Sequence, residues 1–170
     1  GASKLNEINE LVRYLKKNKV NNYALLKCTS SYPAPVEDSN IKTILDIKKK
    51  FKVEVGLSDH TPGIGAAVTA VAYGASIIEK HFTLSRNDGG LDDSFSITPD
   101  ELYSLVNETR RAWSSIGKKF YGILKSEKGS LIFKRSIYTS KEIKKGELFT
   151  KNNIKVIRPN KGVQPKFYEK

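Results

Sequence analysis

The 170-residue sequence contains no methionine, one cysteine and only two histidines. The lone Cys28 cannot form a disulfide within the chain, which is typical of a reducing compartment and favours a cytoplasmic location. No apolar run approaches the roughly 18 residues that a membrane-spanning helix needs, and the polar N-terminus does not resemble a signal peptide. We therefore expect no membrane partner. The first residue is Gly1, which suggests a processed chain or a piece of a longer one.

The charge of the chain is strongly positive, with 30 Lys+Arg against 18 Asp+Glu and a net charge of +12. Such an excess can indicate nucleic-acid binding. Here the lysines are scattered in short runs beside apolar helical segments, and aromatic residues do not interleave with them. We therefore favour solvated helix surfaces and an anionic substrate, with nucleic-acid binding as the less favoured alternative.

Apolar periodicity predicts an alternation of helices and strands. Helical spacing occurs in residues 4–17, 41–51, 63–75 and 98–117. Short strand-like segments lie between these helices, at residues 23–30, 53–60 and 76–84. Ser3 and Thr98 are the predicted N-caps of the first and last helices. Strands separated by helices of this length predict parallel βαβ units and hence an α/β fold.

The pattern changes after about Gly129, where short β-prone runs replace long amphipathic helices. We expect a first domain at residues 1–124, a polar linker at 125–132 and a small β-rich unit at 133–170.

Polar side chains gather at the carboxyl ends of the three predicted strands, where parallel α/β proteins form their sites. These residues are Cys28, Thr29, Ser30, Ser31 and Tyr32 after the first strand, Ser58, Asp59 and His60 after the second, and Glu79, His81 and Thr83 in the third. The glycine-rich acidic loop LSRNDGGLDDSFS follows the third strand.

The two histidines, His60 and His81, end consecutive strands. If these strands are neighbours, their axes lie about 4.8 Å apart, and both imidazoles can reach one divalent metal ion that keeps positions open for substrate or water. Asp59 or Glu79 could orient an imidazole. A histidine in a strand is more often structural than a metal ligand. From the spacing alone, the two histidines could be structural or could form a metal site, and both interpretations remain open.

Several longer strings resemble the C-terminal half of the sialic acid synthase family. They are LLKCTSSYPAP, VGLSDHT, AVAYGASIIEKHFTL and SFSITPDEL. The string RSIYTSKEIKKGELFTKNNIKVIRPNKG resembles the start of the SAF (antifreeze-like) domain of that family. Within the family, the loop LSRNDGGLDDSFS is similar to the branch that makes pseudaminic acid.

The resemblance implies part of a (β/α)8 TIM barrel followed by a partial SAF domain. It also implies condensation of phosphoenolpyruvate with 2,4-diacetamido-2,4,6-trideoxy-L-altrose, giving a nine-carbon 2-keto acid and phosphate. In the family, histidines at the positions of His60 and His81 hold Mn²⁺ or Mg²⁺. Glu79 and Asp59 are the chain's own candidates for catalytic support of this centre.

The resemblance also implies substrate contacts. Ser58 and Ser30 fall where the family contacts phosphoenolpyruvate, although Ser30 replaces an asparagine that is common there. Tyr32 and Asp92 fall where it contacts the sugar. Arg158 falls where the SAF domain of one subunit reaches over the barrel of its partner in a homodimer.

The family barrel has eight strands, and this chain resembles it only from about the end of the fifth. We therefore expect the 170-residue chain alone to be inactive. Synthesis of legionaminic acid or N-acetylneuraminate, and a non-catalytic remnant of the family, are the remaining alternatives.

Overall fold

A computed structural model describes residues 1–169 of the chain. The backbone divides into two compact units, one from Gly1 to Lys118 and a second that begins at Lys119. This division lies before the predicted domain end at residue 124. Residues 119–124 contain no helix or strand and belong to the second unit.

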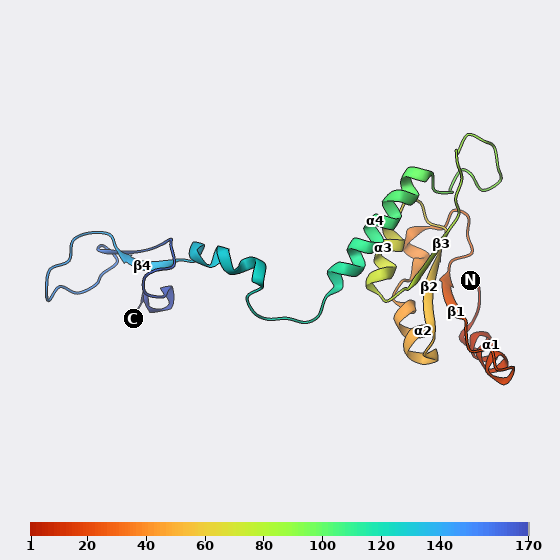
Figure 1. The fold of residues 1–170 in the computed structure, drawn as a ribbon, viewed down its shortest axis with the longest axis horizontal. Coiled ribbons are helices and arrows are strands. Elements are labelled where there is room, and N and C mark those ends of the chain that lie inside the picture. Colours follow the sequence, from red (N-terminus) through yellow and green to blue (C-terminus); the bar gives the residue numbers. More distant parts are fainter. Residues whose placement is uncertain (170) are drawn as a thin grey trace. The chain divides into compact units, whose positions relative to one another are not determined.

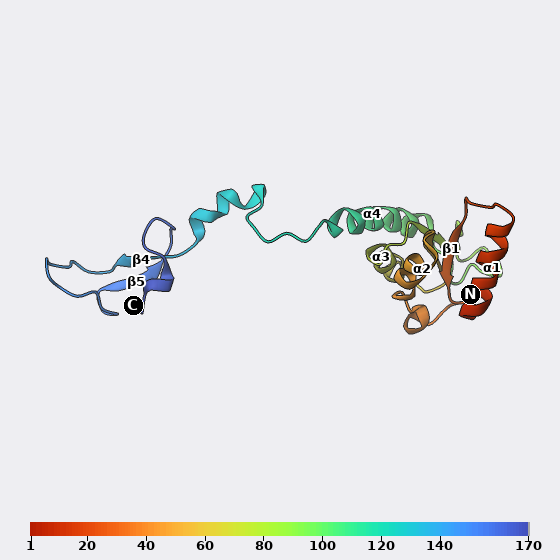
Figure 2. The same ribbon diagram turned by 90° about the horizontal axis from the view of Figure 1, so that it is seen from below.

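The first unit alternates helices with strands, as the sequence pattern predicts (Figure 1). Its elements are α1 (Leu5–Lys17), β1 (Ala24–Cys28), the 3₁₀ helix η1 (Val36–Ser39), α2 (Thr43–Phe51), β2 (Glu54–Asp59), α3 (Gly65–Ala72), β3 (Ile77–Lys80) and α4 (Pro99–Ile116). Both ribbon views show α2 and α3 together on one side of the sheet, and α1 beyond β1 (Figures 1 and 2). The predicted α/β class is confirmed.

The three strands form one parallel sheet in the order β1-β2-β3. The register places Cys28, Ser58 and Glu79 side by side across the sheet. Successive side chains of a strand point to opposite faces, so Asp59 points to the face opposite to that of Ser58. His60, directly after β2, returns to the face of Ser58.

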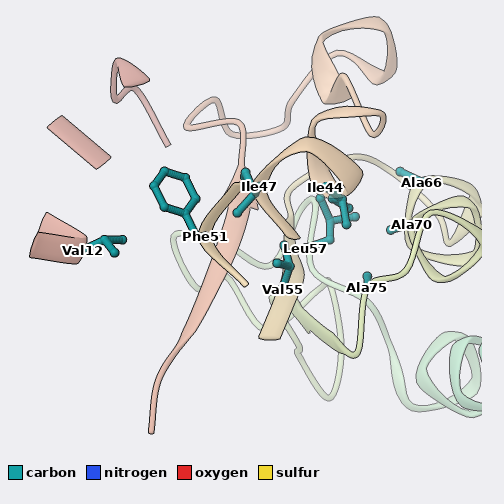
Figure 3. Close-up of a cluster of buried hydrophobic side chains, with 9 residues drawn as sticks. All are labelled: Val12, Ile44, Ile47, Phe51, Val55, Leu57, Ala66, Ala70 and Ala75. Atoms are coloured by element: carbon teal, nitrogen blue, oxygen red, sulfur yellow. The ribbon is translucent and has the colours of Figure 1, made fainter. Parts of the chain in front are cut away.

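The core of the first unit lies between the sheet and the helices that cover one of its faces. Its buried members are Val12, Ile44, Ile47, Phe51, Val55, Leu57, Ala66, Ala70 and Ala75 (Figure 3). Ile44 and Val55 have no solvent exposure, and full burial of such a side chain contributes about 1.5–3 kcal/mol. The alanines of α3 let this helix approach the sheet closely. The core therefore fixes β2, and with it the residues that follow its carboxyl end.

The start of α1 differs from the prediction. The N-cap is Lys4 rather than Ser3. The backbone N–H of Lys4 donates to the Glu7 carboxylate at 2.6 Å, whereas the Ser3 hydroxyl donates to the carbonyl of Gly1 at 3.0 Å. The Glu7 carboxylate in the first turn thus accepts the hydrogen bond from the N-cap N–H, whereas the Ser3 hydroxyl does not cap the helix.

The start of α4 agrees with the prediction. Thr98 is the N-cap, Pro99 is the first helical residue, and the Thr98 N–H donates to the Glu101 carboxylate at 2.8 Å. This carboxylate also connects the helix to the preceding loop, as described below.

The second unit contains a small antiparallel pair, β4 (Ser136–Thr139) and β5 (Ile154–Ile157). Two 3₁₀ helices flank it, η2 (Lys125–Phe133) and η3 (Pro165–Phe167). The predicted linker at residues 125–132 forms most of η2.

Candidate functional site

The carboxyl ends of β1, β2 and β3 meet at one edge of the parallel sheet, as expected from the sequence. His60 and His81 follow the last residues of β2 and β3. Their ring centroids are 5.1 Å apart, with an edge-on arrangement at 73°. The fold therefore brings the only two histidines of the chain together on one face of the sheet.

His60 is buried, with 6% of its surface exposed. Its Nδ1 lies 2.8 Å from the backbone carbonyl oxygen of Thr29. A carbonyl can only accept a hydrogen bond, so Nδ1 carries the proton and a neutral ring has its lone pair on Nε2. The thiol of Cys28 lies farther from the same nitrogen, at 4.0 Å.

The segment that holds His60 is itself anchored on the other face of the sheet. Lys27 Nζ donates to the Thr29 hydroxyl at 3.1 Å, and that hydroxyl donates to the carbonyl of Asp38 at 3.0 Å. Burial lowers the pKa of Lys27, while the nearby Cys28 and Asp38 act in the opposite direction. Thr29 is thus fixed through its side chain while its carbonyl orients His60.

His81 is held by a carboxylate. Its Nδ1 lies 3.2 Å from Oδ2 of Asp92 in the loop between β3 and α4. A carboxylate acceptor at Nδ1 leaves Nε2 as the free nitrogen of a neutral ring, as in His60. Asp92 was predicted to contact a substrate, and the structure gives it this additional partner.

Two aromatic rings enclose the histidine pair. Tyr32 lies with its ring centroid 4.2 Å from that of His60 and 5.7 Å from that of His81. Phe95 lies 5.2 Å from His81 and 5.8 Å from Tyr32. The two rings come from two different loops and contact the imidazoles from the side. Sequence reasoning did not identify Phe95, although it lies in the same acidic loop as Asp92.

The loop that carries Asp92 is tied to the start of α4. The Arg86 guanidinium donates to the carbonyl of Ser96 at 3.1 Å and forms an ion pair with Glu101. The hydrogen bond from Arg86, together with that from the Thr98 N–H, holds the pKa of Glu101 below its usual range. The position of Asp92 therefore depends on an ion pair at the helix start.

The structure corrects two predicted roles. Asp59 does not orient an imidazole: Oδ1 accepts hydrogen bonds from Thr61, Oδ2 pairs with Lys80, and the side chain lies on the face opposite to the histidines. Glu79 is exposed, and across residues 1–169 its carboxylate has no hydrogen-bond or ion-pair partner. Thr29 and Asp92 hold the two rings instead.

The remaining predicted residues occupy different places. Ser58 is buried next to Cys28 and Glu79 in the sheet register. Ser30 is exposed, with its hydroxyl 3.8 Å from the Cys28 thiol. Arg158 directly follows β5 in the second unit.

Two neutral imidazoles at the carboxyl edge of a sheet can supply part of a divalent metal site. No group of three or more His, Cys, Asp or Glu side chains suitable for a metal occurs within residues 1–169. Two nitrogens alone would leave several coordination positions for water or substrate. In the same described range, none of the helices has the length and apolar character to cross a membrane.

Comparison with known proteins agrees with the sequence resemblance. The sequence model of the NeuB family matches residues 1–121, and that of the SAF domain matches residues 134–170. A pseudaminic acid synthase of Campylobacter jejuni is 43% identical over 169 residues, which cover 99% of this chain and 49% of the relative. An N,N'-diacetyllegionaminic acid synthase of the same organism is 41% identical over 172 residues, covering 99% and 52%.

Solved structures show the same relationship. The N-acetylneuraminic acid synthetase of Leptospira borgpetersenii, in complex with citrate, aligns with a TM-score of 0.69 and 39% identity, covering 77% of this chain and 46% of that one. The spore coat polysaccharide biosynthesis protein SpsE of Bacillus subtilis aligns with a TM-score of 0.64 and 33% identity, covering 98% and 52%. The chain thus spans about half the length of these relatives. Because the family match extends over most of its residues, the chain belongs to the NeuB family and carries SAF-domain sequence after it.

Proposed function

We propose that this chain is the C-terminal part of the (β/α)8 barrel, with the start of the SAF domain, of a pseudaminic acid synthase. The reaction joins C3 of phosphoenolpyruvate to the aldehyde carbon of 2,4-diacetamido-2,4,6-trideoxy-L-altrose. Water adds at C2 and phosphate leaves, which gives a nine-carbon 2-keto acid. The observation that carries the proposal is the convergence of His60 and His81, 5.1 Å apart between ring centroids, in a chain 43% identical to a pseudaminic acid synthase.

The two histidines would hold the divalent ion, Mn²⁺ or Mg²⁺. Their hydrogen bonds support this role. Thr29 bonds to Nδ1 of His60 and Asp92 to Nδ1 of His81, which leaves Nε2 of each ring free to bind the metal. When bound, the ion would act as a Lewis acid that polarises the sugar aldehyde. Asp92 keeps the proton on Nδ1 of His81 and thereby keeps its Nε2 lone pair available.

The neighbouring side chains suit two anionic or polar substrates. Ser58 and Ser30, with hydroxyls at the strand ends, would bind phosphoenolpyruvate. Tyr32 would contact the sugar, because its ring lies beside that of His60. Asp92 would direct its second carboxylate oxygen to the sugar. Glu79 shares the face of Ser58 and is free to contact a substrate.

The second unit would complete the site in a homodimer. In this arrangement the SAF domain of one subunit covers the barrel of its partner, and Arg158 contacts an N-acyl group of the sugar. The guanidinium has the hydrogen-bond donors that an amide carbonyl requires.

Other acceptor sugars define the second candidate function. The 41% identity to an N,N'-diacetyllegionaminic acid synthase is close to that of the first relative, and both identities extend over nearly the whole chain. The complete protein should therefore be assayed with the altrose derivative, with the legionaminic acid precursor and with N-acetylmannosamine. Preference for the altrose derivative would support the first proposal, and preference for another sugar would replace it. Absence of turnover with all three, in protein that is folded and loaded with metal, would support the non-catalytic remnant.

The metal assignment has its own test. In the complete protein, His60→Ala and His81→Ala should each abolish high-affinity Mn²⁺ binding measured by titration, because each removes one ring nitrogen ligand. Lys49→Ala, at an exposed position of α2, is the control and should bind Mn²⁺ normally. Unchanged affinity in His60→Ala would refute the metal assignment.

A further inference from the structure

A buried ion pair lies behind the two histidines, on the opposite face of the sheet. Lys80 Nζ and Asp59 Oδ2 are 2.9 Å apart, and their side chains are only 3% and 1% exposed. Asp59 directly precedes His60, and Lys80 directly precedes His81. In the register of the sheet, Asp59 and Lys80 are the last paired residues of β2 and β3.

Both charges have further partners in the turn that follows β2. Oδ1 of Asp59 accepts hydrogen bonds from the Thr61 N–H at 2.9 Å and from the Thr61 hydroxyl at 2.8 Å. Lys80 Nζ also donates to the Thr61 carbonyl at 2.5 Å. One compact network thus joins the end of β2, the end of β3 and the residue on the far side of His60.

The network fixes the backbone on either side of His60. Asp59 precedes this histidine and Thr61 follows it; both are buried, they bond to each other, and both accept hydrogen bonds from Lys80 Nζ. His81 is held in a comparable way. Lys80 directly precedes His81, and the carbonyl oxygen of His81 accepts a hydrogen bond from the Ile97 N–H at 2.9 Å.

Stability alone does not account for this pair. Removing two charges from water is costly, and well-packed apolar residues of similar volume are often equally stable in such positions. Hydrogen bonds that orient groups bound to a metal, by contrast, strongly affect metal affinity. An ion pair placed at the adjacent ends of two strands can set the separation of whatever follows each strand.

We propose that Asp59 and Lys80 are positioning residues: by clamping the ends of β2 and β3 to Thr61, they set the spacing and orientation of the His60 and His81 imidazoles. This positioning already holds in the metal-free protein. Its effect on metal binding rests on the proposed function of the histidine pair.

Three variants of the complete protein test the proposal. Lys80→Met keeps the aliphatic stem and removes the cation, and Asp59→Asn keeps the shape and removes the anion. The double variant Asp59→Asn/Lys80→Met leaves no unpaired buried charge, so it is the variant to use if either single change prevents folding. Lys50→Met breaks the exposed pair between Lys50 and Asp46, 3.5 Å apart, and is the matched control.

The first measurement is made without metal. Long-range ¹H–¹⁵N spectra of the histidine rings report which ring nitrogen carries the proton. In the unaltered protein and in Lys50→Met, we expect Nδ1–H for His60, because of its bond to Thr29. In the three clamp variants, we expect mixed tautomers and altered ring chemical shifts.

The second measurement is Mn²⁺ affinity, by electron paramagnetic resonance titration well below the melting temperature of each variant. We expect the clamp variants to bind about 10–100-fold more weakly, and Lys50→Met to stay within about twofold. Lys80→Arg, which keeps a cation, should recover part of the loss.

Folded clamp variants with ring spectra and Mn²⁺ affinity like those of the unaltered protein would show that the pair only stabilises the fold, and would overturn the proposal. If the unaltered protein binds no Mn²⁺, the proposed metal function fails. In that case unchanged ring spectra in the variants would refute the clamp, and altered spectra would support it.

Discussion

Oδ2 of Asp92 lies 3.2 Å from Nδ1 of His81, across the loop that leads from β3 to α4. This contact fixes the tautomer of a histidine that is 32% exposed and therefore has more freedom than its buried neighbour. It also connects the ring to a loop whose position depends on Arg86 and Glu101.

Replacing Asp92 by Asn should weaken Mn²⁺ binding by the complete protein about 10–100-fold, because the ring loses the carboxylate that orients it. Asp88→Asn removes a carboxylate from the same loop without touching His81 and should have little effect. The measurement is a metal titration of both variants. Equal affinities would show that Asp92 does not orient the histidine for the ion.

Gly56 lies at the centre of the sheet, and any side chain there would collide with its neighbours. A Cβ at this position would lie 2.4 Å from the Ile77 carbonyl oxygen and 2.6 Å from the Leu26 side chain. We expect Gly56→Ala to destabilise the protein by about 1–3 kcal/mol, as other overpacked core positions do.

The control for this change is Gly65→Ala, because the space around Gly65 is open. Alanine at this helical position should leave the melting temperature unchanged or raise it. Chemical denaturation of both variants gives the comparison. A Gly56→Ala protein as stable as the unaltered one would mean that the sheet relaxes around the new methyl group.

The stabilising contribution of Glu101 should depend on pH. Its folded-state pKa is lowered below the ordinary value of 4.5, first by the hydrogen bond from Arg86. A lowered pKa means that the stabilisation is present above the ordinary value and is lost as the pH falls through the folded-state value. The melting temperatures of the unaltered protein and Glu101→Gln should therefore differ at pH 7 and converge as the pH falls below 4.5 and through the lower folded-state pKa.

Glu108→Gln, on the exposed part of the same helix, serves as the control for this pH series. If the difference in melting temperature between the unaltered protein and Glu101→Gln stays constant to the lowest pH measured, the carboxylate charge has no stabilising role at the start of α4.

The 170-residue chain by itself should form no keto acid from phosphoenolpyruvate and the altrose derivative. The sheet of its described residues has three strands, so β1 and β3 each have an unpaired edge, whereas a (β/α)8 barrel closes through eight. The measurement is a keto-acid assay of this chain beside the complete protein. Turnover by the isolated chain would contradict the expectation.

Periodicity predicted the order of helices and strands, and it did so for physical reasons. The apolar residues of α2 and β2 are those that pack in the core, so their spacing records which faces are buried. Helix and strand ends were less predictable. Ser3 has the chemistry of an N-cap, but Lys4 occupies that position because Glu7 supplies the acceptor for its N–H.

The site was predictable to a similar extent. Parallel strands end at the same edge of a sheet, so the sequence placed His60 and His81 close together. Their hydrogen-bond partners could not be predicted. One is the Thr29 carbonyl, a backbone atom that every residue has. The other is the carboxylate of Asp92, eleven residues after His81 in an irregular loop. A loop has no periodicity from which the direction of its side chains can be predicted.

The prediction that Asp59 could orient an imidazole was wrong. Alternation along the strands places Asp59 and Lys80 on the face opposite to the histidines. Alternation alone does not give the register of β2 and β3, and only that register brings Asp59 beside Lys80 as an ion pair.

The pairs Asp59–His60 and Lys80–His81 therefore form a two-sided element, with charges on one face and imidazoles on the other. Deletion or insertion of a single residue in β2 or β3 would exchange the faces. The change would turn Asp59 in β2, or Lys80 in β3, towards the site, and would turn the adjacent histidine into the apolar core. These two strands should consequently tolerate substitutions far better than changes in length, and variation in length should be confined to the loops that follow them.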